Sequence, residues 1–322
     1  MSEKEKEIQK PQREPTPSPA DSNRSLGASL ILSNGWTILT GQNNKATSLL
    51  VTAQALVLCG LPYKKIKETH YQRFAKTPQG SLTMTITAQD PKYPIPYGRD
   101  RALLAWVTTK AIQGKSPVVQ WKSTNEFMKT FNIDQGGKDY KLVWNSWQRL
   151  ARASILLNYS TSDAGENVRS FPFFESTFVP GPPVMSGKVV DIRSRMLPGF
   201  CYYIELSNTL WEHLKKHPVP LSLELMKQFK NEPKAWDFAA FLSWRSFLCR
   251  MNVKVARIPW PDLVQQLGSC DKDQKQLRKS LKRVLKKVQI YWPELRAEFK
   301  VGGLLEIRPP FMGVLPVLES KK

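Results

Sequence analysis

Apolar side chains recur along the chain with two different periods, and each period predicts a type of element. In residues 81–88, apolar positions alternate strictly with polar ones, which is typical of a half-buried strand. Other segments place apolar residues three or four positions apart, as on one face of a helix. We therefore expect helices over residues 45–58, 100–113, 138–153, 232–250 and 272–289, and further strands over residues 118–121, 155–159, 199–206 and 255–258.

The same order of elements occurs twice. Each copy has a helix, a short strand, a short helix, a turn, a long helix and then β-structure. The short helix of the first copy opens with Ser123 and Glu126 at the spacing of a capping box. That of the second opens near Pro261, since proline is tolerated in a first helical turn. A helix-turn-helix with an appended β-hairpin, here residues 299–307, is a winged helix. The repetition therefore predicts two of them.

Composition along the chain divides it into three parts. Residues 1–25 are polar and rich in proline, with five bases and five acids, and we expect a disordered tail. Residues 26–210 form the predicted first winged-helix domain with an N-terminal extension, and residues 211–322 the second. Residues 161–199 are rich in Pro, Gly and Ser, so we expect a long loop there. The predicted fold class is α+β and helix-rich.

Charge narrows the class of partner. Lys and Arg number 48 against 27 acids, a net charge of +21, which favours nucleic acid first and a membrane surface second. No run of 18 apolar residues exists, so we expect no span of a bilayer. Residues 1–21 lack the apolar core of a secretory signal. Four cysteines stand singly without a CxxC pair, which favours reduced thiols and a cytoplasmic protein.

The predicted helix over residues 272–289 separates charge from apolar surface. Leu277, Leu281, Val284 and Val288 share one face. Two acids, Asp271 and Asp273, stand at its N-terminus, where the helix dipole favours them. Without Glu partners four residues away, the basic charge is uncompensated, which weakens the alternative of a merely solvated face. The candidate DNA contacts here are Lys275, Arg278, Lys279, Lys282, Arg283 and Lys286.

The predicted helix over residues 138–153 carries a polar stripe that is less basic. Asn and Gln can pair with adenine edges, and Arg with guanine. We therefore hypothesise that this helix contributes more sequence discrimination, and the helix over 272–289 more phosphate affinity. The alternative is again a merely exposed face. The candidate DNA contacts here are Lys138, Lys141, Asn145, Gln148, Arg149 and Arg152.

Residues typical of enzymes are sparse. The chain has no GxxxxGK[ST] loop for nucleotide hydrolysis. His213 and His217 stand four apart, as metal ligands would, but without the Glu of an HExxH motif, so an ordinary helix surface is favoured. Tyr202 and Tyr203 favour a core strand over a nicking tyrosine, because no metal-holding histidine cluster accompanies them. Trp144 and Trp147 favour core packing over base stacking. We expect no catalytic residue, no metal and no cofactor.

Several blocks resemble the plasmid-encoded RepA replication initiators of Gram-negative bacteria. The strongest is PYGRDRALLAWVTTKA at residues 96–111, which is similar to that family's LPYG, LLAW and TTEA blocks. Residues 123–131, Gly136-Gly137 and the HPVPL of residues 217–221 add further ordered matches, and the resemblance covers about residues 52–310. It departs at Lys110, where an acid is common, and it is sparse in residues 1–45 and 161–199.

The resemblance implies a function that composition alone does not. Such proteins bind repeated duplex DNA sites at a plasmid origin and recruit the host initiator and replicative helicase. They are not catalysts, and related initiators often repress their own promoter and exist as monomers and homodimers. Residues 161–199 are then a candidate dimer contact. Two alternatives stay open: a winged-helix transcriptional regulator that acts only on promoters, and an enzyme that nicks its own origin for rolling-circle replication.

Overall fold

The computed structural model describes residues 49–77, 80–161, 165–179, 202–268 and 274–309, together with two short paired strands, β1 (Ser29–Ile31) and β2 (Thr37–Leu39). The predicted disordered tail, residues 1–25, and most of the predicted loop over residues 161–199 lie outside the described residues. The loop prediction is wrong in its described part, where Gly165–Pro172 and Phe174–Phe178 form strands. The expected mixture of helices and strands is confirmed.

The first unit is built around one buried helix. Its elements are, in chain order, α2 (Asp100–Gly114), β6 (Val118–Trp121), α3 (Asn125–Thr130), α4 (Gly137–Ala151), β9 (Phe174–Phe178) and β10 (Tyr202–Leu206). The three strands form one antiparallel sheet in the order β6-β10-β9. Trp106 of α2 packs edge-on against Trp121 of β6, Phe127 of α3 and Trp147 of α4. One aromatic side chain therefore ties all the helices of this unit to its sheet.

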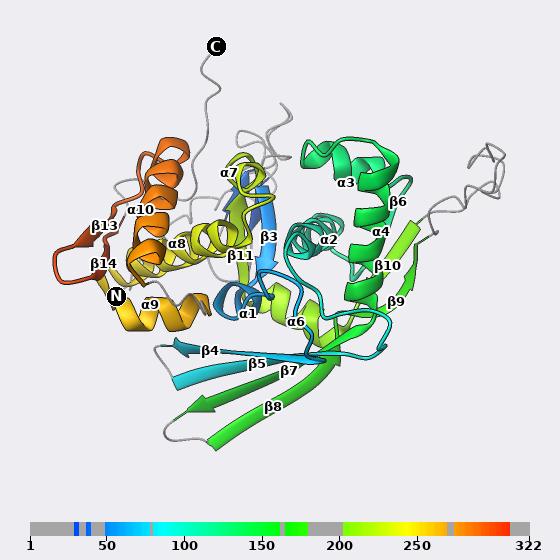
Figure 1. Cartoon of the computed structure of the whole chain (residues 1–322), viewed down its shortest axis with the longest axis horizontal. Helices are drawn as coiled ribbons and strands as arrows, with labels where there is room; N and C mark the ends of the chain where they lie inside the picture. Colours follow the sequence, from blue (N-terminus) through cyan, green and yellow to red (C-terminus); the bar gives the residue numbers. More distant parts are fainter. Residues whose placement is uncertain are drawn as a thin grey trace, which may run out of the picture.

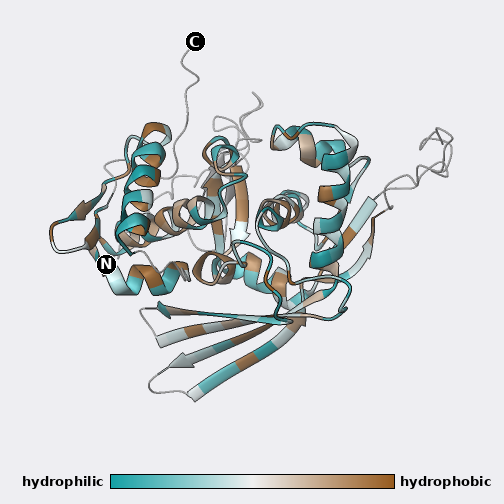
Figure 2. Ribbon diagram, viewed as in Figure 1, coloured by the Kyte–Doolittle hydropathy of each residue, from teal (hydrophilic) through white to brown (hydrophobic). Residues whose placement is uncertain are grey.

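The second unit repeats this arrangement. Its elements are, in chain order, α8 (Pro233–Asn252), β12 (Ala256–Pro259), α9 (Trp260–Leu267), α10 (Gln274–Tyr291), β13 (Ala297–Lys300) and β14 (Leu304–Ile307). The strand order is β12-β14-β13, so the first strand pairs with the last in both units. The twofold order of elements predicted from the sequence is present (Figure 1). In Figure 2, α4 and α10 carry hydrophilic residues along much of their length.

A separate four-stranded antiparallel sheet interrupts the first unit. Its strands are β4 (His70–Thr77), β5 (Gly80–Ala88), β7 (Ala153–Thr161) and β8 (Gly165–Pro172), in the order β4-β5-β7-β8. Strand β7 follows α4 directly and covers the predicted strand 155–159, but it pairs with β5 rather than β6. The strand predicted after the first long helix therefore belongs to the four-stranded sheet and not to the sheet that contains β6. Local alternation of apolar and polar residues predicts a strand but does not identify its pairing partner.

The helix predicted over residues 45–58 is wrong in its described first half. Residues Leu49–Ala53 form β3, which pairs with β11 (Pro218–Ser222), and only Gln54–Leu58 form a helix, α1. Helix α2 supports β3 directly: Thr109 Oγ1 accepts the N–H of Val51 at 2.7 Å, and Thr108 donates to the Val51 carbonyl. Tertiary pairing here overrides the helical preference of Leu and Ala. Helices α6 (Asn208–Lys216) and α7 (Leu223–Gln228) flank β11.

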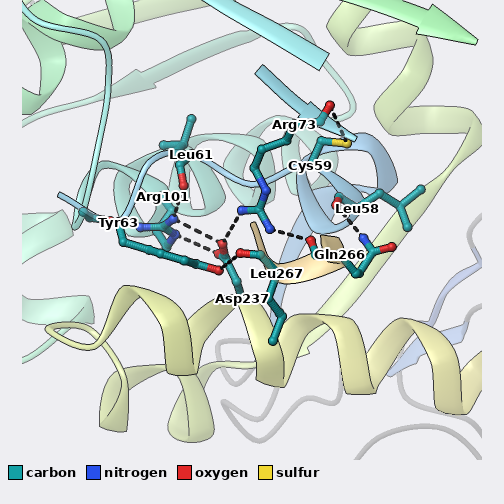
Figure 3. A network of polar contacts seen from close by, with 10 residues as sticks. Leu58, Cys59, Leu61, Tyr63, Arg73, Arg101, Asp237, Gln266 and Leu267 are labelled. Atoms are coloured by element: carbon teal, nitrogen blue, oxygen red, sulfur yellow. Dashed lines mark hydrogen bonds and ion pairs between the residues drawn. The ribbon is translucent and has the colours of Figure 1, made fainter. Parts of the chain in front are cut away.

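A buried polar network joins the two units to the four-stranded sheet (Figure 3). Asp237 of α8 accepts hydrogen bonds from Arg101 of α2, at 2.8 Å, and from Arg73 of β4, at 3.2 Å. Tyr63 donates to the carbonyl of Leu267, and Arg73 donates to that of Gln266. The network therefore fixes α9 as well, and it leaves the two units in one defined relative orientation.

Two glycines make room for this network. A Cβ on Gly60 would overlap a carboxylate oxygen of Asp237. A Cβ on Gly268 would lie 2.6 Å from Nε of Arg73, and Gly268 also has a positive φ of 57°. The Gly268 turn expected from the sequence therefore has a second role, because only a residue without a side chain admits the buried arginine.

Candidate nucleic-acid interface

Helix α10 presents the cationic face expected from its sequence. Leu277, Leu281, Val284 and Val288 are buried, as predicted, and Leu285 joins them. Among the described residues, no carboxylate lies within ion-pair distance of the five exposed basic residues given below, whereas Lys287 pairs with Glu232 at 3.8 Å. Asp271 and Asp273 lie outside the described residues. The helix therefore offers unpaired positive charge along its outer side, at Lys275, Lys279, Lys282, Arg283 and Lys286.

Arg278 differs from the other bases of α10. Its guanidinium lies 4.8 Å from the ring centroid of Trp260 on α9. It also passes the β13–β14 turn so closely that a Cβ on Gly303 would lie 2.5 Å from Nη2. The Gly303 φ of 82° is in the left-handed region as well. Arg278 therefore connects α9, α10 and the hairpin, and its predicted contact with DNA stays a prediction.

Helix α4 presents a polar stripe of different character. Lys138 and Lys141 are exposed, whereas Asn145 and Gln148 are half-buried. On the opposite side, Trp147 is fully buried, as expected for a core residue.

The short helix α3, which precedes α4, starts differently from the predicted capping box. Ser123 Oγ accepts the N–H of Asn125, and the Glu126 carboxylate accepts that of Lys122. Both side chains still satisfy orphan amides, each one position earlier than predicted.

Arg149 is engaged within the protein. Its guanidinium makes two hydrogen bonds of 2.7 Å to the carboxylate of Asp100 at the start of α2. The Arg149 side chain is 12% exposed and that of Asp100 is 0% exposed. The guanidinium also lies 4.6 Å from the ring centroid of Tyr97. Such a bidentate pair fixes the relative orientation of the two side chains. Arg149 therefore holds α4 against the start of α2, where the PYGRD residues 96–100 lie.

Gln148 and Arg152 form a pair at the end of α4. Arg152 donates to Oε1 of Gln148, lies over the ring of Tyr93 and makes an ion pair of 3.4 Å with Asp90. A glutamine that reads adenine uses its carbonyl and its amide together. In this arrangement Arg152 occupies one of the two lone pairs of the Gln148 carbonyl, so Gln148 reads a base either with the other lone pair or after Arg152 turns away. Lys110, the departure from the family pattern, pairs with Glu126 at 3.7 Å.

The residues considered for catalysis have structural neighbours. Tyr202 stacks on Trp121 and Tyr203 on Phe178, as expected for strand residues. His213 is not on an ordinary helix surface: it is largely buried and its Nε2 accepts the N–H of Ala55 in the first turn of α1. Burial first, then His217 and Arg169, lower the pKa of His213 to about 4. Its role as an N-terminal cap for α1 was not foreseen, because the two residues are far apart in sequence.

Other expected features concern cysteines, metals and membranes. Cys59 and Cys249 are free and buried, and burial raises the pKa of Cys59 to about 12. Cys201 and Cys270 lie outside the described residues. Within the described ranges, His, Cys, Asp and Glu form no group of three able to hold a metal ion. No helix in these ranges combines the length and apolar character needed to cross a bilayer.

Comparisons with known proteins give likeness of shape alone. No family model and no curated protein matches the chain. A crystal structure of a selenomethionine derivative of domains 2 and 3 of RctB aligns with a TM-score of 0.49 and 12% identity, over 77% of this chain and 94% of that one. A second crystal structure of RctB domains 2–3 aligns with a TM-score of 0.44 and 11% identity, over 76% and 92%.

Proposed function

We propose that the chain is a duplex-DNA-binding replication initiator that uses two winged-helix units. The observation that carries this proposal is the repeated order of helix, strand, helix, helix and hairpin, with the last strand between the other two in each sheet. This is the order of a helix-turn-helix with an appended wing, in which the second helix of the pair enters the major groove. Helices α4 and α10 occupy that position.

The two helices divide the work of binding in this proposal. The basic side chains of α10 that have no ion pair among the described residues contact phosphates, and Lys138 and Lys141 of α4 contact further phosphates. Asn145 and Gln148 read DNA bases, with Arg152 released from Gln148 when DNA binds. The main role of Arg149 and Arg278 is to hold these helices against their neighbours, because each guanidinium is already engaged within the protein. Each phosphate that a basic side chain neutralises releases counterions, so the affinity for DNA falls steeply as the salt concentration rises.

The buried network around Asp237 supports a fixed spacing of the two DNA contacts. Because it joins both units, α4 and α10 are presented as one body rather than as two tethered modules. Selection of bound duplexes from random DNA tests this. We expect two half-sites at one preferred spacing. Half-sites recovered at many spacings with equal frequency would contradict a rigid pair of units.

The replication role rests on the resemblance of residues 96–111 and the other blocks to plasmid RepA initiators. We infer that the chain binds repeated sites at a plasmid origin, recruits the host initiator and replicative helicase, and represses its own promoter. It acts without catalysis, in the cytoplasm, and forms homodimers through residues 161–199, most of which lie outside the described residues. A plasmid that carries the selected sites but lacks its own initiator tests the inference, since it is maintained only when the chain is supplied.

A transcriptional regulator is the second candidate, because the same two units would serve promoter binding. It predicts repression of a reporter through the selected sites without any maintenance of the plasmid. The rolling-circle alternative predicts a covalent bond between tyrosine and DNA. The stacking of Tyr202 on Trp121 and of Tyr203 on Phe178 favours a packing role for both, and denaturing gels of incubated origin DNA test for the adduct.

A further inference from the structure

A cavity of about 490 Å³ has no residue of α4 or α10 in its lining. Residues of β7 and β8 line one side and residues of α6 the other, with Leu58 of α1 and Trp244 of α8 completing it. In Figure 1 this region lies where α6 faces the four-stranded sheet. Its volume is in the range of ~300–1,000 Å³ that is typical of small-molecule sites. The proposed DNA-binding function makes no use of it.

The charges that line the cavity are mostly positive. Arg169 of β8 and Lys216 of α6 line it, and among the described residues neither has a carboxylate within ion-pair distance. Arg169 donates only to the neutral side chain of Asn167, at 3.4 Å. The one carboxylate in the lining, Glu212, is already paired with Lys215 at 2.6 Å. Two cations therefore face the cavity without a carboxylate partner in the described part of the chain, which is typical of a site for an anion.

The histidines of the lining respond to this charge. Burial is the largest cause of the lowered pKa of His213, followed by His217 and Arg169, and burial followed by Lys216 lowers the pKa of His217. Because His213 Nε2 accepts the N–H of Ala55, the neutral ring carries its proton on Nδ1 and remains a donor. Both effects agree with a positive potential in the cavity, and neither adds negative charge to it.

The lining also has an apolar and aromatic part. Leu58, Leu157 and Trp244 are buried core residues at its wall, and Tyr159 is half-buried. A molecule that joins a phosphate to a flat apolar ring matches both parts of the lining, since small-molecule sites combine apolar walls with a few polar groups that fix orientation. Hydroxyl and amide groups of Ser160, Thr209 and Asn167 supply neutral hydrogen bonds.

We propose that this cavity binds a small phosphorylated molecule of nucleotide size, with its phosphate between Arg169 and Lys216 and its ring beside Tyr159. The ligand joins β7 and β8 of the four-stranded sheet to α6. Its binding therefore stabilises the packing of the four-stranded sheet against α6.

Titration calorimetry of the full chain without DNA tests the proposal, with the four ribonucleoside monophosphates, adenosine and inorganic phosphate as probes. We expect one-site binding of at least one monophosphate with a Kd at or below about 1 mM. Adenosine and inorganic phosphate bind at least about tenfold more weakly, because each satisfies only one part of the lining. Arg169→Gln and Lys216→Gln each weaken the monophosphate about tenfold, as expected for loss of a charge-assisted hydrogen bond.

Lys254→Gln is the matched control, since Lys254 is exposed and lies outside the cavity lining. It leaves nucleotide affinity unchanged. If a variant fails to fold, acetylation of Lys216 in the natural chain gives a second readout: a bound monophosphate protects Lys216 and not Lys254. The proposal would be overturned if no monophosphate showed saturable binding, or if both cavity variants bound the monophosphate as tightly as the natural chain does. Weaker DNA binding in Lys282→Ala with nucleotide binding intact separates this site from the proposed function.

Discussion

The carboxylate of Asp237 on α8 lies 3.2 Å from the guanidinium of Arg73 on β4, with the two side chains 6% and 2% exposed. Arg101 of α2 approaches the same carboxylate to 2.8 Å. One acid thus serves two buried arginines from different parts of the fold. The carbonyl oxygen of Leu61 accepts a further hydrogen bond from Arg101, and that of Gln266 accepts one from Arg73, whose Nε has no partner among the described residues.

Asp237→Asn is therefore expected to destabilise the chain by about 3 kcal/mol or more, because two buried guanidiniums lose their only counter-charge. The free energy of unfolding in urea measures this. Asp262→Asn is the control, since the Lys76–Asp262 pair is 63% and 39% exposed. It should cost no more than about 1 kcal/mol. Similar losses for both variants would show that the network around Asp237 contributes no more than a surface ion pair.

The sequence predicts some of these features and not others for a physical reason. The buried face of α10 follows from apolar residues three and four apart, which is local information. The pairing of β3 with β11 joins segments more than 160 residues apart, and no local pattern in 45–58 records it. The same holds for Arg149, whose spacing on α4 suggests an exposed stripe while its guanidinium binds Asp100 of α2. The buried apolar face of a helix is therefore predictable from local spacing, whereas the burial and the partner of a charged side chain such as Arg149 are not.

The two glycines of the β13–β14 turn allow a paired test of Arg278. Both have positive φ, 84° at Gly302 and 82° at Gly303, but an added Cβ meets Arg278 only at Gly303. Gly302→Ala should cost about 1 kcal/mol from backbone strain alone. Gly303→Ala should cost about 1 kcal/mol more, because Arg278 must leave the ring of Trp260. Urea unfolding measures both, and the difference between them should disappear in an Arg278→Ala background. A difference that persists there would exclude Arg278 as its cause.

His213 makes the stability of the chain depend on pH. Its pKa falls from 6.5 to about 4 on folding, chiefly through burial. A lowered pKa means that the unfolded chain takes up the proton first, so this contribution is present above pH 6.5 and is lost between pH 6.5 and about 4. His213→Gln should flatten that part of the stability profile measured by urea unfolding. His70→Gln, at an exposed position, should retain the original slope. Equal slopes for His213→Gln and the natural chain would contradict the assignment.

Lys282 and Gln148 test the division of labour between α10 and α4. Lys282 is exposed without an ion pair among the described residues, so Lys282→Ala should weaken binding to all duplexes alike and reduce the slope of log K against log salt by about 1. Gln148→Ala should leave that slope unchanged and cost about 1–3 kcal/mol only on sites that hold its preferred base. Arg149→Ala serves as the structural control and should lower stability more than either, because it leaves the buried Asp100 unpaired. Fluorescence anisotropy on selected and scrambled duplexes at several salt concentrations measures both terms. Sequence-blind losses of equal size for Lys282→Ala and Gln148→Ala would show that both helices bind phosphates only.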